Sequence, residues 1–283
     1  MAELPEISLS IVIPVYNEEA SLPALFERVL AVAEGLGRPY EILFTDDGSA
    51  DGSRALLAEF QAAHPDTVRV IVFEGNFGQH MAITAAFERV RGQVVVTLDA
   101  DLQNPPEEIP KLLAEIDAGH DVVGGYRAER RDNFFRRWSS AAMNGVRARI
   151  TNIEMRDQGC MLRAYTRPIV DRIAEAQESA SFIPALANFY AANPTEVEVR
   201  HEARRAGRSK YRLYDLIRLN FDLVTGFSLV PLQVFTLFGM VVAALSLYLV
   251  IDLAVRRITG DPEADVTFTL LAITFFLLGV VIV

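Results

Sequence analysis

Residues 94–108 read Val-Val-Val-Thr-Leu-Asp-Ala-Asp-Leu-Gln-Asn-Pro-Pro-Glu-Glu. The apolar, β-branched start predicts a buried strand, and the two prolines end it because proline has no N–H to give to the ladder. Asp99 and Asp101 follow the strand one residue apart, so in an extended chain their side chains point the same way, with Gln103 close behind. Hard oxygen ligands of this kind suit Mg²⁺ or Mn²⁺ holding the phosphates of a substrate. We therefore predict a metal site at these three residues; the alternative is a turn whose acidic residues cap the next helix.

The sequence on both sides of this stretch alternates apolar, β-rich runs with helical patterns. Such alternation predicts an α/β fold, a parallel sheet covered on both faces, with ligands bound beyond the carboxyl ends of its strands. The predicted strands are Leu9–Val15, Glu41–Thr45, Val68–Phe73, Val94–Leu98 and Val122–Gly124. The predicted helices between them are Ser21–Glu34, Asp51–Ala63, Gln79–Val90 and Glu107–Ala118.

A polar or glycine-bearing motif follows each predicted strand. In order along the chain these motifs are Pro14–Glu19, Asp46–Ser49, Asn76–His80, Asp99–Gln103 and Arg127. Hydrogen-bonding groups at the first two strand ends, with the aromatic face of Tyr16, could hold a nucleobase and a ribose; the alternative is two capped turns. The glycine-flanked helix start at Gly78 is a candidate anion site. It is no dinucleotide fingerprint, because no G-x-G-x-x-G follows the strand. His80 has no His or Cys at ligand spacing, so we predict a hydrogen-bonding role for it.

The C-terminal third predicts a membrane anchor. Residues 223–251 are 29 residues without a charge, more than the ~20 needed to cross a bilayer, and residues 266–283 give a second, shorter run that ends at the last residue. A helix that stopped inside lipid would be costly, so we expect the natural chain to continue. Residues 213–224 follow an amphipathic pattern that predicts a helix in the membrane interface, the alternative being a helix packed on the catalytic domain.

Charge and cysteine content indicate the surroundings. Residues 1–199 hold 18 basic and 30 acidic residues, a net charge of −12, whereas residues 200–218 hold seven and two, a net charge of +5. By the positive-inside rule the N-terminal domain is cytoplasmic. The basic stretch next to a span favours anionic lipid over nucleic acid. The single Cys160 excludes an intrachain disulfide and fits a reducing compartment, and the acidic N-terminus does not resemble a signal peptide.

These observations predict five regions. They are a catalytic domain at 1–199, a basic loop and interfacial helix at 200–228, a first span at 229–253, an external connector at 254–265 and a second, incomplete span at 266–283.

In this order, and joined to Asp99-Ala100-Asp101, the motifs resemble those of family 2 glycosyltransferases with a GT-A fold. Longer segments narrow the resemblance to the branch that acts on polyprenyl phosphates, and within it to undecaprenyl-phosphate 4-deoxy-4-formamido-L-arabinose transferases. The segments that carry it are 76–80, 98–110, 159–165, 182–184 and 207–211. The resemblance implies a metal-dependent, inverting transfer of a sugar from a nucleotide donor to undecaprenyl phosphate at a bacterial inner membrane. It also implies a homo-oligomer, and a role in lipid A modification.

The resemblance gives individual residues roles. Asp99, Asp101 and Gln103 would hold the metal and the diphosphate, and Asp157 would be an active-site carboxylate, the alternative being a loop carboxylate that caps a turn. The predicted donor site consists of Pro14, Tyr16, Asn17, Glu18, Asp46, Asp47, Gly78, Gln79, His80, Asp99 and Ala100. The candidates for binding the acceptor phosphate are Arg127, Arg136, Arg137, Arg204 and Lys210, the last two doubling as topology signals.

Three other functions remain open at this stage. A related lipid-phosphate transferase using UDP-glucose or GDP-mannose would have nearly the same motifs. A processive polysaccharide synthase fits less well, because Arg136-Arg137-Trp138 lies too early for its Gln-x-x-Arg-Trp motif. A catalytically silent nucleotide-sugar sensor is disfavoured by the presence of all three of Asp99, Asp101 and Asp157.

Overall fold

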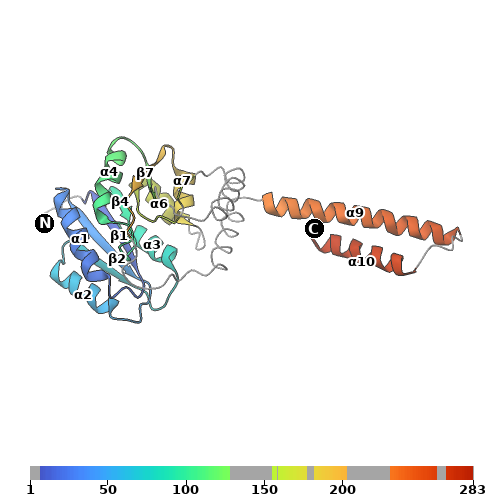
Figure 1. Ribbon diagram of the computed structural model, residues 1–283, viewed down its shortest axis with the longest axis horizontal. Helices are drawn as coiled ribbons and strands as arrows, with labels where there is room; N and C mark the ends of the chain where they lie inside the picture. The colour runs from blue at the N-terminus through green and yellow to red at the C-terminus, as the bar shows by residue number, and fades with distance from the viewer. Residues whose placement is uncertain are drawn as a thin grey trace. The chain divides into compact units, whose positions relative to one another are not determined.

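The computed structural model describes residues 7–127, 155–157, 159–176, 182–202, 230–259 and 266–282 (Figure 1). They belong to two compact units, one ending at Tyr214 and the other carrying the two C-terminal helices. Four predicted acceptor ligands, the interfacial helix and most of the connector lie outside the described residues. The four ligands are Arg136, Arg137, Arg204 and Lys210.

The first unit is built on a seven-stranded sheet in the order β3-β2-β1-β4-β6-β5-β7. Six strands run parallel, but β6 runs antiparallel to both of its neighbours, so the sheet is mixed and the prediction of a parallel sheet was wrong in this respect. The prediction missed β6 because it is a short strand without an apolar run; it is inserted between two parallel strands. The strands are β1 Leu9–Val15, β2 Tyr40–Asp46, β3 Val68–Val72, β4 Val94–Thr97, β5 Val122–Arg127, β6 Arg163–Thr166 and β7 Pro194–Val199.

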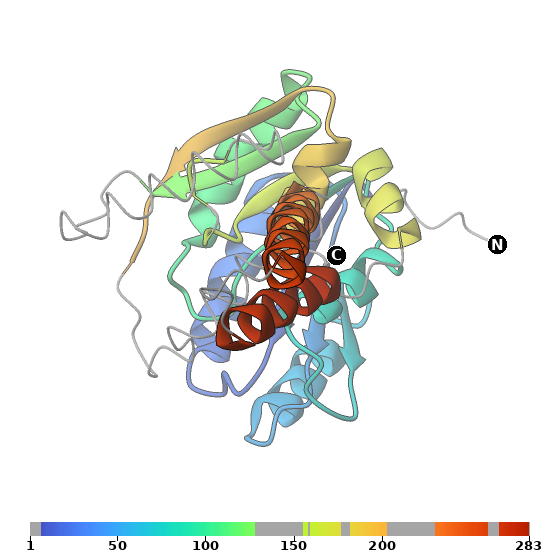
Figure 2. The ribbon, with the colours of Figure 1, turned by 90° about the vertical axis from the view of Figure 1, so that its right-hand side faces the viewer.

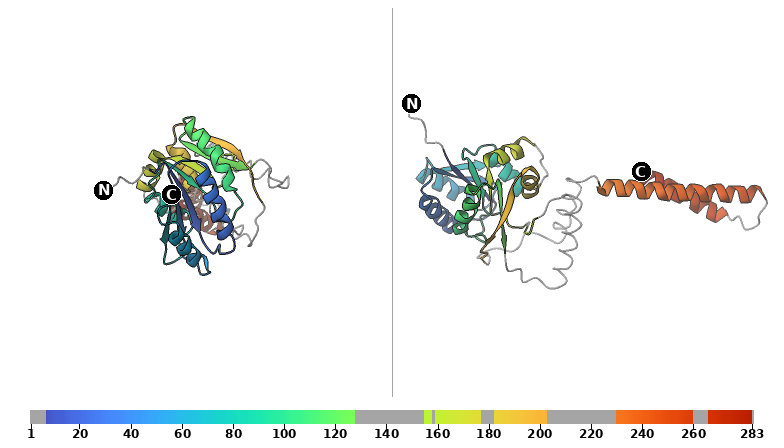
Figure 3. Two further views of the ribbon diagram at one scale, coloured as in Figure 1. Left: turned by 90° about the vertical axis from the view of Figure 1, so that its left-hand side faces the viewer. Right: turned by 90° about the horizontal axis from the view of Figure 1, so that it is seen from above.

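Helices cover both faces of this sheet (Figure 3). On one face α1, α2 and α4 pack over a core that includes Ile11, Phe44 and Leu112; α3, α6 and α7 cover the other face. The helices are α1 Leu22–Gly35, α2 Ser53–Ala63, α3 Gln79–Phe87, the 3₁₀ turn η1 Pro106–Glu108, α4 Ile109–Asp117, α6 Arg167–Glu175 and α7 Ile183–Tyr190. The single helix predicted from Glu107 is therefore a 3₁₀ turn followed by α4, which begins with Pro110 in its first turn.

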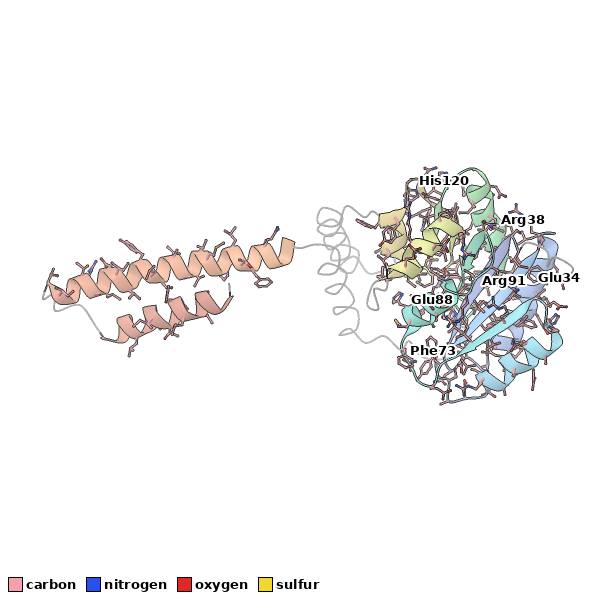
Figure 4. All side chains as sticks on the ribbon, turned by 180° about the vertical axis from the view of Figure 1, so that it is seen from behind. Glu34, Arg38, Phe73, Glu88, Arg91 and His120 are labelled. Carbon is pink, nitrogen blue, oxygen red and sulfur yellow. The ribbon has the colours of Figure 1, made fainter. Side chains whose placement is uncertain are left out.

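The sheet has two chemically different edges. The carboxyl ends of the six parallel strands lie along one edge, and β6 starts there because Arg163 pairs with Thr97 at the end of β4. Figure 4 shows the two edges: Arg38, just before β2, lies opposite Phe73, which follows β3. In Figure 2 the edge strand β7 runs beside β5.

The second unit consists of α9 Val230–Ile258 and α10 Val266–Ile282, which pack side by side (Figure 1). A Cβ at Gly279 would lie 2.6 Å from the backbone nitrogen of Ala243, so glycine permits this close approach. Among the described residues, one stretch, Gln233–Arg256 in α9, is long and apolar enough to cross a membrane. Only 11% of its most apolar window is buried, unlike the core helix of a soluble protein. α9 ends at Ile258, beyond the predicted residue 253, and the second span remains a prediction.

Candidate active site

The loops after β1 and β2 are tied together by hydrogen bonds. Asn17 has a positive φ of 53°, a conformation that asparagine tolerates better than most residues. Its backbone N–H donates to Ser49 Oγ at 2.9 Å, and its Oδ1 accepts from the backbone N–H of Ala50 at 2.8 Å. The Asn17 side chain, predicted to contact the donor, therefore organises the neighbouring loop.

Asp46 and Asp47 connect the second loop to its surroundings. Asp46 is buried and accepts from the Ser49 N–H at 3.1 Å and from Arg54 Nε at 3.2 Å. Asp47 accepts from the backbone N–H groups of Phe77 and Gly78 at 2.7 and 2.9 Å. Burial raises the pKa of Asp47 although both of these bonds favour its ionised form. These two predicted donor residues thus hold the second and third loops in place.

The loops after β2 and β3 approach each other very closely. Gly48 has φ +73°, and a Cβ there would lie 2.5 Å from the carbonyl carbon of Gly75, so only glycine fits. Tyr16 is 37% exposed and Phe77 65% exposed, so both loops present aromatic surface to solvent. Pro14, two residues before Tyr16, is buried inside β1.

The acidic loop after β4 is a turn and not an extended segment. Leu102 has φ 62°, and Asp101 Oδ1 accepts from the Gln103 N–H at 3.0 Å, as in a short side-chain-capped turn. The prediction that Asp99 and Asp101 share an extended chain was therefore wrong. β4 ends at Thr97, and the turn that replaces the extended segment begins at Ala100, between the two aspartates.

Asp99 is held by two amide side chains. Its Oδ1 accepts from Gln79 Nε2 at 2.7 Å and its Oδ2 from Asn104 Nδ2 at 3.3 Å. Gln79 opens α3, so it links the third loop to the acidic loop. Burial, and then the nearby charge of Asp101, raise the pKa of Asp99 to about 7. Among the described residues, the hydrogen bonds to the Asp99 carboxylate thus come from neutral amides.

A buried carboxylate with a raised pKa and a second carboxylate nearby fit a divalent cation. Among the described residues no three His, Cys, Asp or Glu side chains gather as a metal cage. Mg²⁺ commonly uses one or two carboxylates and completes its coordination with water and substrate phosphates. Asp99 and Asp101, with the partly buried Gln103 beside them, fit a site of that kind, which would be complete only with a phosphorylated substrate.

Asp157 forms a buried ion pair with Arg127. The fork of Arg127, at the end of β5, donates from Nε to Oδ2 at 2.5 Å and from Nη2 to Oδ1 at 2.9 Å, and the Gly159 N–H donates to Oδ1 at 3.0 Å. The side chain of Asp157 is 5% exposed. Both residues were predicted, but not as partners. Arg127 holds Asp157, and binding of an acceptor phosphate by Arg127 remains a prediction.

Arg163 fixes the segment that carries Asp157. It is fully buried at the start of β6 and donates to the carbonyl oxygens of Asp157 at 2.8 Å and Cys160 at 3.0 Å. A Cβ at Gly124 would lie 2.8 Å from Arg163 Nη1, so this glycine makes room for the guanidinium. Asp157 is therefore held through both its backbone and its carboxylate.

His201 is a site residue that the sequence reasoning missed. It follows β7, and its ring bonds to the carbonyl of Gln103 and feels the charges of Arg127, Asp101 and Asp157. Partial burial, and then Arg127, lower the pKa of His201. The rule that functional groups follow strand ends would have found it, had β7 been recognised.

His80 is buried beside an aromatic side chain. Its ring packs edge-on against Phe182, with centroids 5.3 Å apart, and its buried Nδ1 has no hydrogen-bond partner among the described residues. Burial lowers the pKa of His80 to about 4, so the ring is neutral at pH 7. The hydrogen-bonding role of His80 toward the donor stays a prediction.

A mixed α/β sheet whose carboxyl edge gathers three loops and an acidic pair defines a class of nucleotide-dependent enzymes. The profile of glycosyl transferase family 2 matches residues 10–174, more than half of the chain. The protein belongs to this family and is a glycosyltransferase with a GT-A fold.

Solved structures share this fold. Glucosyl-3-phosphoglycerate synthase from Mycobacterium tuberculosis, in complex with Mn²⁺, UDP and phosphoglyceric acid, aligns with a TM-score of 0.53 at 17% identity over 76% of this chain and 75% of that one. Mannosyl-3-phosphoglycerate synthase from Rubrobacter xylanophilus gives 0.52 at 15% identity over 77% and 72%. S. aureus TarS 1-349 with UDP-GlcNAc gives 0.51 at 19% identity, over 76% of this chain but 65% of that one.

Proposed function

We propose that this enzyme transfers a sugar, with inversion, from a nucleotide-diphosphate donor to undecaprenyl phosphate at the cytoplasmic face of a bacterial inner membrane. The donor we favour is UDP-4-deoxy-4-formamido-L-arabinose, which would supply a lipid-linked sugar for lipid A modification. One observation carries the choice of a lipid acceptor: a glycosyltransferase unit shares its chain with α9, an exposed apolar helix long enough to span a membrane.

The donor site would lie across the first three loops. Tyr16 and Phe77 offer aromatic surface for the base, and the three loops are already fastened to one another through Asn17 and Asp47. A fastened site loses little conformational freedom on binding, which favours affinity. The UDP complexes of the fold relatives support a uridine nucleotide.

Asp99 and Asp101, beside Gln103, would hold Mg²⁺ or Mn²⁺. The ion, when bound, would offset negative charge on the leaving diphosphate. Gln79 and Asn104 keep Asp99 oriented by hydrogen bonds at 2.7 and 3.3 Å. The Mn²⁺ in the complex of the mycobacterial synthase supports a divalent cation without deciding between the two metals.

The acceptor needs positioning more than activation. A phosphate monoester has a second pKa of about 6, so its oxygen is already anionic near neutral pH. Asp157 is bonded through both oxygens to Arg127, which suits an orienting or electrostatic role better than that of a base. We expect Asp157→Asn to lower kcat at every pH. A variant that kept turnover at high pH and lost only the acidic limb of the pH–rate profile, where a general base titrates, would contradict this role.

The test is sugar transfer to undecaprenyl phosphate by the full chain in detergent with Mg²⁺ or Mn²⁺. UDP-4-deoxy-4-formamido-L-arabinose, UDP-glucose and GDP-mannose are offered separately, with Asp101→Asn as control. Transfer from one donor, lost in the variant, would establish the reaction and name the sugar. Metal-dependent UDP binding without transfer from any of the three would overturn the proposal and favour a sensor.

A further inference from the structure

Two acidic residues next to the metal loop have no role in the reaction described so far. Glu107 and Glu108 belong to the 3₁₀ turn η1, which follows the acidic loop and begins at Pro106. Glu108 has no exposed side-chain surface, so its charge must be compensated inside the protein. Its partners show what this turn does.

Glu108 is compensated by two cations of different origin. Lys111, one turn along in α4, bonds to Oε2, and Arg200 Nε donates to Oε1 at 2.5 Å. Burial opposes ionisation of Glu108, but the bonds from Lys111 and Arg200 keep its pKa below the ordinary value. Lys111 is three residues from Glu108 in sequence, whereas Arg200 follows β7 and is 92 residues away.

The residues that follow Arg200 are fastened to the same place. The Glu202 N–H donates to the carbonyl of Gln103 at 2.9 Å, and His201 bonds to the same carbonyl through its ring. Arg28 on α1 links the Glu202 carboxylate, at 3.1 Å, with both oxygens of Glu107, at 2.8 and 2.7 Å. We call Arg200–Glu202 the strap: α1, η1 and the metal loop all hold it.

The strap has a position that matters for catalysis. It lies against the carbonyl of Gln103, within the loop that carries both metal carboxylates, and it includes His201, which lies near Arg127 and Asp157. We propose that Arg200, through Glu108, is a positioning residue for the acceptor: by fixing the strap, it holds His201 beside the metal loop. This inference rests on the proposed function, because it assumes a lipid-phosphate acceptor.

The chain offers a matched pair of variants. Arg200→Gln and Lys111→Gln each remove one cation from the same buried carboxylate, but only the first releases the strap. The Arg200 side chain is 71% exposed and that of Lys111 54% exposed, so both variants should fold. Arg200→Lys keeps the charge and serves as the conservative rescue.

Kinetics of the full chain with undecaprenyl phosphate test the positioning role. We expect Arg200→Gln to raise the KM for this acceptor about tenfold, with the donor KM changed by less than about twofold, since one charge-assisted bond to a buried group is lost. Arg200→Lys should recover part of the loss. An equal rise in Lys111→Gln, or an unchanged acceptor KM in Arg200→Gln, would overturn the inference.

Hydrogen exchange separates this inference from the proposed function. Amides in a peptide covering the strap should exchange faster in Arg200→Gln than in wild type, and not faster in Lys111→Gln. If wild-type protein fails to transfer sugar to undecaprenyl phosphate while the strap responds in this way, the proposed acceptor is wrong and the fastening of the strap stands. If transfer occurs and the strap amides do not exchange faster in Arg200→Gln, the fastening of the strap by Arg200 is contradicted and the proposed function stands.

Discussion

The two edges of the sheet treat a buried carboxylate in opposite ways. At the amino edge, Glu41 in β2 accepts bonds from Ser10 Oγ at 2.7 Å, from Arg69 at 2.9 Å, and from both the backbone and the side chain of Arg91. At the carboxyl edge, Asp99 receives two neutral amides and faces Asp101. Glu41 is therefore balanced by cations of the protein, whereas among the described residues the hydrogen bonds to Asp99 come from neutral amides.

The pKa values follow this difference. Burial opposes ionisation of Glu41, but its hydrogen bonds outweigh that cost and hold its pKa below the ordinary value. Burial and Asp101 raise the pKa of Asp99 to about 7. A perturbed acid that the protein does not compensate marks a functional site more clearly than burial alone.

The largest expected effect is on activity at the carboxyl edge. Asp101→Asn should lower kcat/KM at least about a hundredfold, because a charge that stabilises the metal and the diphosphate is lost. Its midpoint of unfolding should stay near that of wild type, since the substitution also removes repulsion with Asp99. Transfer assays and thermal melts on the same sample check this; a variant that unfolds early would show that the pair is structural.

The matching change at the amino edge should do the reverse. Glu41→Gln should lower the free energy of unfolding by about 2–3 kcal/mol, because it leaves Arg69 and Arg91 without their buried partner, while both retain access to water. Activity per folded molecule should remain that of wild type. Urea unfolding and active-site titration measure the two quantities, and a loss of kcat in fully folded protein would contradict the comparison.

The contribution of Glu41 should depend on pH in one direction. Its pKa in the folded protein lies below the ordinary 4.5, so its stabilising effect is complete above that value and is lost as the pH falls through the lower, folded pKa. We expect the stability difference between wild type and Glu41→Gln to be constant above about pH 5 and to shrink below it. Urea unfolding at a series of pH values tests this, and a difference that grows on acidification would reverse the assignment.

The smallest effect should come from an exposed pair near the amino edge. Arg38 and Asp117 are 38% and 50% exposed. Asp117→Asn should change the free energy of unfolding by less than about 0.5 kcal/mol, because solvent and salt screen an exposed pair. The same urea unfolding assay on Asp117→Asn, repeated in high salt, measures the change for an exposed pair, against which the change for Glu41→Gln is compared. A change as large as that of Glu41→Gln would mean that burial does not explain the contrast.

The local sequence pattern was enough to predict the strands in the first half of the fold. Leu9–Val15 matches β1 residue for residue, since an apolar run of that length has few alternatives. β6 has the sequence Arg-Ala-Tyr-Thr, and β7 begins with Pro194 and alternates with glutamates, so neither has the apolar run used to recognise the others. Their pairing depends on strands distant in sequence, which periodicity does not report.

The site shows the same division. The rule that ligands bind at carboxyl strand ends put the loops of Asp47, Gly78 and Asp99 at one edge, and in the structure Gly78 bonds to Asp47 and Gln79 to Asp99. It could not pair Arg127 with Asp157, since Asp157 comes before its strand and not after one. The turn at Leu102 could not be predicted from the sequence either, because leucine rarely adopts a positive φ.

The antiparallel strand β6 has a consequence for how this enzyme could diversify. A connection between two parallel strands must cross back along the length of the strands before the next one can begin. β5 ends and β6 begins at the carboxyl edge, so no such return is needed between them. Arg127 is the last residue of β5, and Asp157 comes six residues before β6. The reversal of β6 therefore allows one ion pair to join the end of one strand to the approach to the next on the edge that carries the metal loop, and an insertion between β5 and β6 would leave the register of the sheet unchanged.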